Sequence, residues 1–391
     1  MKKIVLTSLL SAFAMAVNAA PLVTVGDQMD IFFRGSVIGN YNSNITYASG
    51  GENKKFEDYS GTLRLGGEVD YGRTSKFKAN IKFYEDITRY VDHKEFDNNL
   101  AHILANASYV EANWNVRAYF SFDQMYQNDS DLIWGTGVIE KDLISYNLWK
   151  AGVKGSYDFS EKVYGTLGFD WTRTEYIHKW NDIYSSYDIF SLPVSVLYRV
   201  TQKIAVGLSY QYRLTDYFDG PAVANWGEER NDHFFGVTVN GEIAPKLTCE
   251  AYLGAQYRDY GSTQGDDTTL SGNIKFGYEV TEKLGVYVRA LRDFGSSATR
   301  YSYINTLCEG GLNYYFNPKI IGTASLTYRV ADYELIDRKD ETVWTRVGIS
   351  YVPNKFVTLS FNYNYLNNNC DEIESANYNQ HLLTISASLR Y

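Results

Sequence analysis

One short phrase recurs along the chain: an alternating run of polar and apolar residues, a tight turn that ends in lysine, and another alternating run. The turn lysines from Lys162 to Lys355 lie 36 to 43 residues apart. They belong to the turns F-S-E-K-V, V-T-Q-K-I, I-A-P-K-L, V-T-E-K-L, F-N-P-K-I and V-P-N-K-F, with a looser copy, G-R-T-S-K-F, at residues 72–77. A period of this length holds two strands, one tight turn and one longer loop. A repeat this regular predicts one all-β domain and not a set of unlike domains.

The length of the alternating runs indicates strands that cross a membrane. Every second residue is apolar over residues 63–71, 163–171 and 204–214. Membrane-crossing strands need ~9–11 residues, whereas soluble strands are usually ~5–6 residues long. The chain is also rich in aromatic residues, with 35 Tyr, 20 Phe and 7 Trp, as is typical of the girdles at both faces of a membrane. We therefore expect a transmembrane antiparallel up-and-down β-barrel with short periplasmic turns and longer outer loops. The outer loops are expected near residues 43–59, 128–145, 176–187, 218–232, 261–268, 295–302, 333–342 and 366–377.

The turns also predict the number of strands. Seven turns are explicit, and the wide gap between Lys76 and Lys162 predicts an eighth near residues 112–115. Eight turns join sixteen strands, and a first strand at residues 30–42 and a last at 378–391 bring the expected number to about 18. An even number keeps both ends of the barrel on the periplasmic side. Because residues 100–110 make the least regular strand, 16 strands remain the alternative.

The first 19 residues have the pattern of a secretion signal. Lys2 and Lys3 form the charged start, an apolar segment follows, and V-N-A at residues 17–19 fits the small-residue cleavage rule. We therefore assign residues 1–19 to a signal peptide and residues 20–391 to the barrel. No later segment supplies the ~20 apolar residues that a membrane-crossing helix needs.

The free-energy cost of placing a charge in lipid predicts which face of each strand is exposed to water. A Lys or Arg on the lipid face at mid-membrane costs ~2–4 kcal/mol, so Lys150 and Lys154 should point into the lumen. Inward-facing cations outnumber inward-facing acids, which predicts a weakly basic, water-filled lumen although the whole chain carries a net charge of −9. The residues expected to line the pore are Arg64, Lys82, Lys150, Lys154, Asp170, Arg213, Glu250, Lys275, Arg289, Glu309, Arg329 and Arg346. Those arginines could instead be neutralised on the wall by Asp170, Glu250 and Glu309.

The last strand has the pattern of an assembly signal. Apolar residues alternate to an aromatic at the end: Leu383, Ile385, Ala387, Leu389 and Tyr391. We expect the barrel-assembly machinery of the outer membrane to recognise this segment.

Two segments near the start carry a family resemblance. They are G-D-Q-M-D-I-F-F-R-G, which begins at Gly26, and Y-S-G-T-L-R-L-G-G-E, which begins at Tyr59. They resemble the type-2 β-barrel porin group, and the resemblance extends over nearly the whole chain after the signal peptide. It implies an outer-membrane porin of a Gram-negative-type bacterium, and some members of the group look associated with the export of surface polysaccharide.

These observations favour passive diffusion of ions and small hydrophilic solutes. An export pore for surface polysaccharide, or a structural or adhesive barrel whose loops close the lumen, are the alternatives. The expected partners are outer-membrane lipid and lipopolysaccharide, the barrel-assembly machinery and small hydrophilic solutes, while a homo-oligomer is left open. The acidic net charge disfavours nucleic acid.

The sequence contains few features that indicate an enzyme. The five histidines are dispersed along the chain, and no G-x-S-x-G motif is present. Neither metal-ligand spacing nor a phosphate-binding loop stands out. We therefore expect no catalytic residues, no metal and no cofactor.

Overall fold

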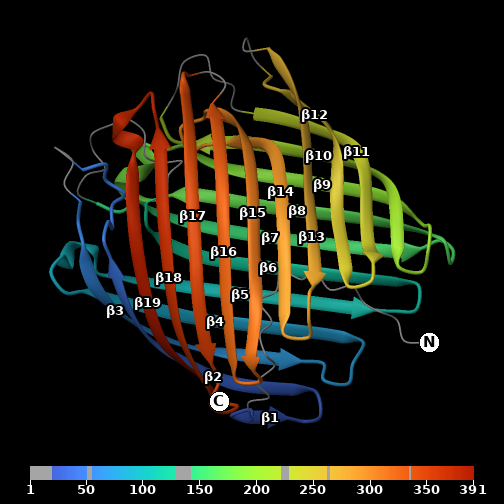
Figure 1. Ribbon diagram of the computed structural model, residues 1–391, viewed down its shortest axis with the longest axis horizontal. Helices are drawn as coiled ribbons and strands as arrows, with labels where there is room; N and C mark the ends of the chain where they lie inside the picture. The colour runs from blue at the N-terminus through green and yellow to red at the C-terminus, as the bar shows by residue number, and fades with distance from the viewer. Residues whose placement is uncertain (1–19, 51–54, 129–141, 222–228, 262–264, 334–335) are drawn as a thin grey trace.

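A computed structural model describes residues 20–50, 55–128, 142–221, 229–261, 265–333 and 336–391. Among these residues, eighteen long strands, β2 to β19, form a closed ring, and a short strand, β1, precedes them (Figure 1). The strands are β1 Val23–Val25, β2 Met29–Asn42, β3 Asp58–Tyr71, β4 Phe77–Tyr90, β5 Asn98–Val110, β6 Trp114–Tyr126, β7 Ser145–Asp158, β8 Val163–Tyr176, β9 Ser186–Arg199, β10 Ile204–Asp219, β11 Glu229–Ala244, β12 Leu247–Asp259, β13 Asp266–Glu279, β14 Leu284–Ser296, β15 Ser302–Asn317, β16 Ile320–Tyr333, β17 Arg338–Tyr351, β18 Val357–Cys370 and β19 Tyr378–Arg390. Short 3-10 helices are η1 Lys94–Phe96, η3 His178–Asp182 and η4 Glu374–Ala376. The expected signal peptide lies outside the described residues.

The ring closes between its first and last long strands. Each strand from β2 onward pairs antiparallel with the next, and β19 returns to β2 in a ladder that runs from Leu382↔Asn42 to Arg390↔Arg34. The predicted all-β barrel of 18 strands is confirmed, and the eighth turn lies where it was expected, between the end of β5 and the start of β6. Closure removes the free edges that a membrane does not tolerate.

Several outer loops are shorter than the sequence predicted. Residues 218–232, 333–342 and 366–377 were expected to be loops, but β11 begins at Glu229, β17 begins at Arg338 and β18 continues to Cys370. The strand β1, which pairs with the start of β2, was also missed. These strand ends are polar on both faces, so the apolar alternation fades while the backbone ladder continues. Those loop boundaries were therefore wrong.

The two faces of the wall differ as the alternation predicted. Large apolar side chains that share one face of their strands are exposed, including Val153, Leu167 and Leu208. Lys150 and Lys154 lie on the opposite face of β7, since side chains alternate along a strand. Aromatic pairs such as Tyr157 with Phe159 lie near the tight turns. No helix in the described part of the chain is long and apolar enough to cross a membrane.

One glycine makes room for an aromatic ring on the inner face. The Tyr287 ring of β14 lies over Gly311 of β15, where a Cβ atom would come within 2.5 Å of a ring carbon. We predict that Gly311→Ala destabilises the barrel by about 1–3 kcal/mol, because overpacking displaces the ring. The measurement is the temperature at which the folded band on a gel converts to the unfolded band.

Gly310 provides the matched control. An added Cβ there would have its nearest neighbour at 3.9 Å. Gly310→Ala should therefore leave the conversion temperature close to that of the unchanged protein. Equal effects of the two substitutions would contradict the steric explanation.

Candidate functional site

The wall of the barrel splits between β13 and β14 at the loop end, where the longer connections lie. β13 and β14 pair only from Glu279↔Gly285 to Gly272↔Arg292, although β13 continues to Asp266 and β14 to Ser296. Phe294 of β14 packs under the guanidinium of Arg258, an inward-facing residue of β12, with 4.7 Å between the guanidinium carbon and the ring centre. The end of β14 therefore leaves β13 and bends into the lumen, and Figure 1 shows the bend of β14 near its loop end, while β15 stays paired with β16 as far as Tyr303↔Tyr333.

Four charged residues hold this hairpin against the inner wall, and we call them the arginine clamp: Arg213, Asp232, Arg258 and Asp293. Asp232 accepts hydrogen bonds from Arg213 at 2.7 Å and from Arg258 at 2.6 and 2.8 Å. Arg213 also binds Asp293 of the hairpin, at 2.9 Å. Arg258 and Asp232 are buried, with exposed fractions of 0% and 1%. Charge-assisted bonds of this kind are among the strongest in proteins.

The arginine clamp also replaces part of the backbone pairing that β14 loses. The Phe294 carbonyl oxygen accepts a hydrogen bond from Arg213, and the Gly295 carbonyl oxygen accepts one from Arg258, each at 2.9 Å. Buried carbonyl groups are nearly always paired, so these side chains take the place of a neighbouring strand. The inward position of the hairpin is thus supported by specific contacts.

Residues 297–301, which we call the tip, extend the contact across the lumen. The Ala298 carbonyl oxygen accepts a bond from the Ser185 backbone N–H at 2.8 Å, and Arg300 donates to the Ser185 hydroxyl at 2.8 Å. Tyr217 of β10 donates to the Ser297 carbonyl oxygen at 2.8 Å. The tip therefore joins β10 to the connection between β8 and β9.

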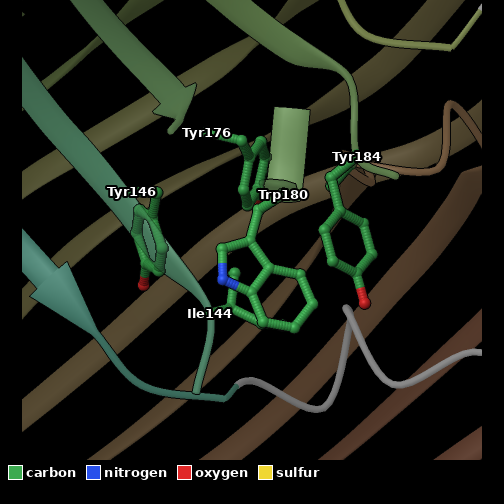
Figure 2. Close-up of a cluster of buried hydrophobic side chains, with 6 residues drawn as sticks. Ile144, Tyr146, Tyr176, Trp180 and Tyr184 are labelled. Atoms are coloured by element: carbon green, nitrogen blue, oxygen red, sulfur yellow. The ribbon is translucent and has the colours of Figure 1, made fainter. Parts of the chain in front are cut away.

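A buried aromatic group, which we call the Trp180 cluster, lies next to the tip. It consists of Ile144, Tyr146, Tyr176, Trp180, Tyr184 and Ala298. Figure 2 shows the Trp180 indole beside Ile144, Tyr176 and Tyr184, and only 2% of the Trp180 surface is exposed. Burial also raises the pKa of the Tyr184 phenol above its ordinary value. The cluster unites the connections that follow β6, β8 and β14.

The neighbouring loops also pack over the outer end of the lumen, on the side of the first strands of the barrel. Ile45 packs with Phe96 and with Leu143, which directly precedes Ile144 of the Trp180 cluster. Asn128 donates to the Thr46 carbonyl oxygen at 2.7 Å. Loops from distant parts of the ring thus contact one another over the loop end, in the part of the chain that the structure describes.

Below this cover, arginines and acids on the inner wall form pairs. Arg64 binds Asp86 through two bonds of 2.6 Å and lies over the Tyr84 ring. Glu68 binds Arg34 at 2.6 Å and Arg390 at 3.0 Å, with Lys82 at 4.0 Å.

The proposed neutralisation of the wall arginines by Asp170, Glu250 and Glu309 is wrong, because none of these three acids forms an ion pair with an arginine among the described residues. Asp170 accepts from the Tyr119 hydroxyl at 2.7 Å, and Glu309 from the Tyr287 hydroxyl at 2.6 Å. Glu250 faces Lys275 across the β12–β13 ladder. Because Arg64 has Asp86 as its direct cross-strand neighbour, that nearer acid takes the guanidinium.

Five of the predicted wall cations have no carboxylate within 4 Å among the described residues, and we call them the unpaired cations: Lys150, Lys154, Lys275, Arg289 and Arg346. Arg289 donates to the Asn273 side chain at 2.8 Å, and Arg346 lies 3.7 Å from the centre of the Trp344 ring. The Lys275 side chain is buried, and its Nζ has no described hydrogen-bond partner. Arg329, another predicted wall cation, donates to Asn305 at 2.8 Å.

Two cavities open along the inner wall toward the tight turns. One, of about 920 Å³, is lined by Asp30, Asp70, Lys78, Arg117 and Arg390 together with their neighbours. The second, of about 510 Å³, includes Glu250, Lys275 and Tyr287 in its lining. Charged linings of this kind suit a water-filled interior.

The sequence did not single out the residues that cover the lumen. Trp180, Arg230, Asp232 and Arg300 lie in or beside predicted loops, where no period assigns a side. A tryptophan inside the polar run H-K-W-N-D at residues 178–182 was the available signal, because a large apolar ring is rarely left in water.

Comparison with known families finds a match for the last strands of the barrel. Residues 294–391, which contain the end of β14 and all of β15 to β19, match the family model described as "Putative beta-barrel porin 2". The end of the chain therefore matches a family of β-barrel porins, and the chain as a whole folds as a porin-like outer-membrane barrel. The porin resides in the outer membrane of a Gram-negative bacterium, so its tight turns face the periplasm and its longer loops face outward.

Solved structures with a similar fold include two porins of Pseudomonas species. OpdK of Pseudomonas aeruginosa, solved with vanillate, has a TM-score of 0.48 and 11% identity, and the match covers 93% of this porin and 99% of OpdK. The BenF-like porin of Pseudomonas fluorescens Pf-5 has a TM-score of 0.48 and 11% identity, covering 94% of this porin and 100% of that chain. A comparison with curated protein sequences finds no match.

Proposed function

We propose that the porin is a passive diffusion pore for ions and small hydrophilic solutes, with a weak preference for anions. The observation that carries this proposal is the set of unpaired cations on the inner wall. Most inward arginines are neutralised by a nearby acid, as Arg64 is by Asp86. The unpaired cations have no such neutralising acid, and rings of like charge set the ion preference of a pore.

The position of these charges around the ring strengthens the proposal. Lys150 and Lys154 lie on β7, whereas Arg289 lies on β14 and Arg346 on β17. In a ring of eighteen strands, β14 and β17 lie about half-way around from β7. An anion that moves along the lumen would therefore meet positive charge on both sides.

A structural barrel closed by its loops is the second candidate. The Trp180 cluster and the in-folded hairpin favour it, because both cover the outer end of the lumen. The two candidates differ in whether water and ions pass through the assembled protein.

Conductance in planar lipid bilayers tests the proposal. We expect purified, folded porin to produce discrete current steps, and a reversal potential in a salt gradient with the sign of an anion-preferring pore. Folded protein, verified by its shifted band on a gel before boiling, that gives no steps at any concentration would leave the closed barrel as the function.

Neutralising the unpaired cations should abolish the anion preference. We predict that Lys150→Gln, Lys154→Gln, Arg289→Gln and Arg346→Gln combined move the reversal potential to that of a non-selective pore, because the excess of inward-facing cations over inward-facing acids is then removed. The control is Lys76→Gln with Lys203→Gln, which removes two turn lysines that are paired with Glu111 and Glu242. An unchanged reversal potential in the fourfold variant would refute the role of these cations.

A further inference from the structure

We propose that the loop end of the β14–β15 hairpin is a gate with two positions, which regulates the pore proposed above and therefore rests on that function. In the lumen-folded position, described above, the tip lies across the lumen. In the second, wall-paired position, β14 continues its ladder with β13 and the tip leaves the lumen. Four observations support the second position.

The register of the two strands continues without a shift into the split. Beyond Gly272↔Arg292, the same antiparallel register would pair Ser271 with Asp293, Leu270 with Phe294, and Thr269 with Gly295. Register in a sheet is set by which side chains reach the lipid and which reach the lumen. The sequence of both strands therefore already fits the wall-paired position.

The alternation of β14 also fits the wall-paired position. Val286, Val288 and Ala290 share the lipid-facing side of β14, and Phe294 falls on that side by the same period. In the wall-paired position Phe294 would lie beside Leu270 on the lipid face. In the lumen-folded position it is instead buried under Arg258, on the inner wall.

The split leaves β13 with a free edge. From Thr268 to Ser271 the strand has no ladder partner in β14 among the described residues, and the Ser271 hydroxyl donates to the Arg292 carbonyl oxygen at 2.9 Å. Leu270 is 62% exposed, which places this edge on the outer surface of the barrel. An unpaired strand edge is unfavourable beside lipid, and the wall-paired position removes it.

The lumen-folded position carries a second cost, in buried charge. Arg230 of β11 and Arg300 of the tip are both buried. Neither of them is bound by a carboxylate of the described residues. Arg230 donates to the Tyr217 hydroxyl and to the Arg300 carbonyl oxygen instead. Buried charge without a counter-charge is unfavourable, whereas the arginine clamp stabilises the same position. A switch requires two positions of similar free energy, each with its own unfavourable contacts.

Movement to the wall-paired position would open the outer end of the lumen. It would break the contacts of the tip with Ser185 and Tyr217 and would withdraw Ala298 from the Trp180 cluster. The width of the lumen beside β10 to β12 would then be set by the barrel wall alone. The hairpin would therefore control conductance while the barrel stays intact.

Engineered disulfides test the two positions in the full porin, in a background with the three native cysteines replaced: Cys249→Ala, Cys308→Ala and Cys370→Ala. Leu270→Cys with Phe294→Cys can join only in the wall-paired position, because the two side chains now lie on opposite faces of the wall. Ser185→Cys with Ala298→Cys joins the lumen-folded position, where the Ser185 nitrogen and the Ala298 oxygen are 2.8 Å apart. Phe276→Cys with Val288→Cys is the control, because these residues are paired below the split in both positions. Cross-linking is read from free-thiol labelling, and conductance is recorded before and after addition of reductant.

We expect all three pairs to cross-link in outer membranes under mild oxidant. The wall-paired disulfide should raise the single-channel conductance roughly twofold or more over the lumen-folded disulfide, since lumen width sets flow. Reductant should abolish the difference, and the control pair should have no effect. The gate is wrong if the 270/294 pair stays reduced while the 276/288 pair cross-links, or if the two locked forms conduct equally. In the first case, channel steps from the parent porin would still support the diffusion function. If the 270/294 pair cross-links and only that form conducts, the gate stands and the porin is closed at rest.

Discussion

Asp232→Asn is expected to lower the free energy of unfolding of the porin by about 3–5 kcal/mol, the usual effect of breaking a buried ion pair. Asp232 accepts bonds from both Arg213 and Arg258, and Arg258 has no other carboxylate within reach among the described residues. The substitution keeps the shape of the side chain and removes the charge, so the loss reflects electrostatics and not packing. Urea-induced unfolding in lipid vesicles, followed by the loss of strand signal, measures it.

Asp158→Asn is the matched control for this effect. Asp158 pairs with Arg199 at 2.5 Å near the tight turns, where both side chains are about one-third exposed. Exposed pairs of this kind contribute ~0–1 kcal/mol, so the control should change stability little. If the two substitutions have the same effect, the arginine clamp is not a special source of stability.

Trp180→Ala is expected to open the outer end of the porin. Removing a buried tryptophan usually costs about 3–5 kcal/mol, and here the loss falls on loops and not on the closed ring. Because the Trp180 cluster unites three connections, we expect residues 177–185 to become accessible to protease added to whole cells. The single-channel conductance should rise at the same time, while the barrel keeps its shifted band on a gel.

Trp114→Ala separates this effect from the simple loss of a tryptophan. Trp114 is 40% exposed, lies at the start of β6 near a tight turn, and stacks on Tyr109 with 5.1 Å between ring centres. Its removal should leave both conductance and protease sensitivity at the outer loops unchanged. A Trp180 variant that behaves like this control would show that the loops do not limit flow.

The wall of the barrel was predictable because its determinants are local. A turn lysine marks every periplasmic connection except the one between β5 and β6, and a period of two assigns each side chain to lipid or water. The hidden turn between β5 and β6 followed from spacing alone, since a strand pair has a nearly fixed length. The free-energy cost of a charge in lipid was enough to predict that Lys150 and Lys154 lie on the other face of β7 from Val153.

The cover of the lumen was not predictable for the same reason. A period of two along a strand predicts on which face each side chain lies. It does not predict whether the neighbouring strand remains paired with it. Phe294 reads as a lipid-facing residue of β14, yet it lies inside because β14 leaves β13 two residues earlier. Arg213 was expected to face open water on the pore wall, but it lies under the hairpin, bound to Asp232 and Asp293.

The closing ladder between β2 and β19 has a consequence for the order of events during biogenesis. It joins side chains as far apart in sequence as Ser36 and Ser388, which are separated by 352 positions and hydrogen-bonded at 2.9 Å. Contacts between such distant residues form slowly, because the whole intervening chain must first be brought together. The strand that is synthesised first therefore stays without its partner until the last strand has been made, and throughout that interval the sheet has two exposed borders. A chain in transit to the outer membrane needs protection for as long as its two ends remain apart.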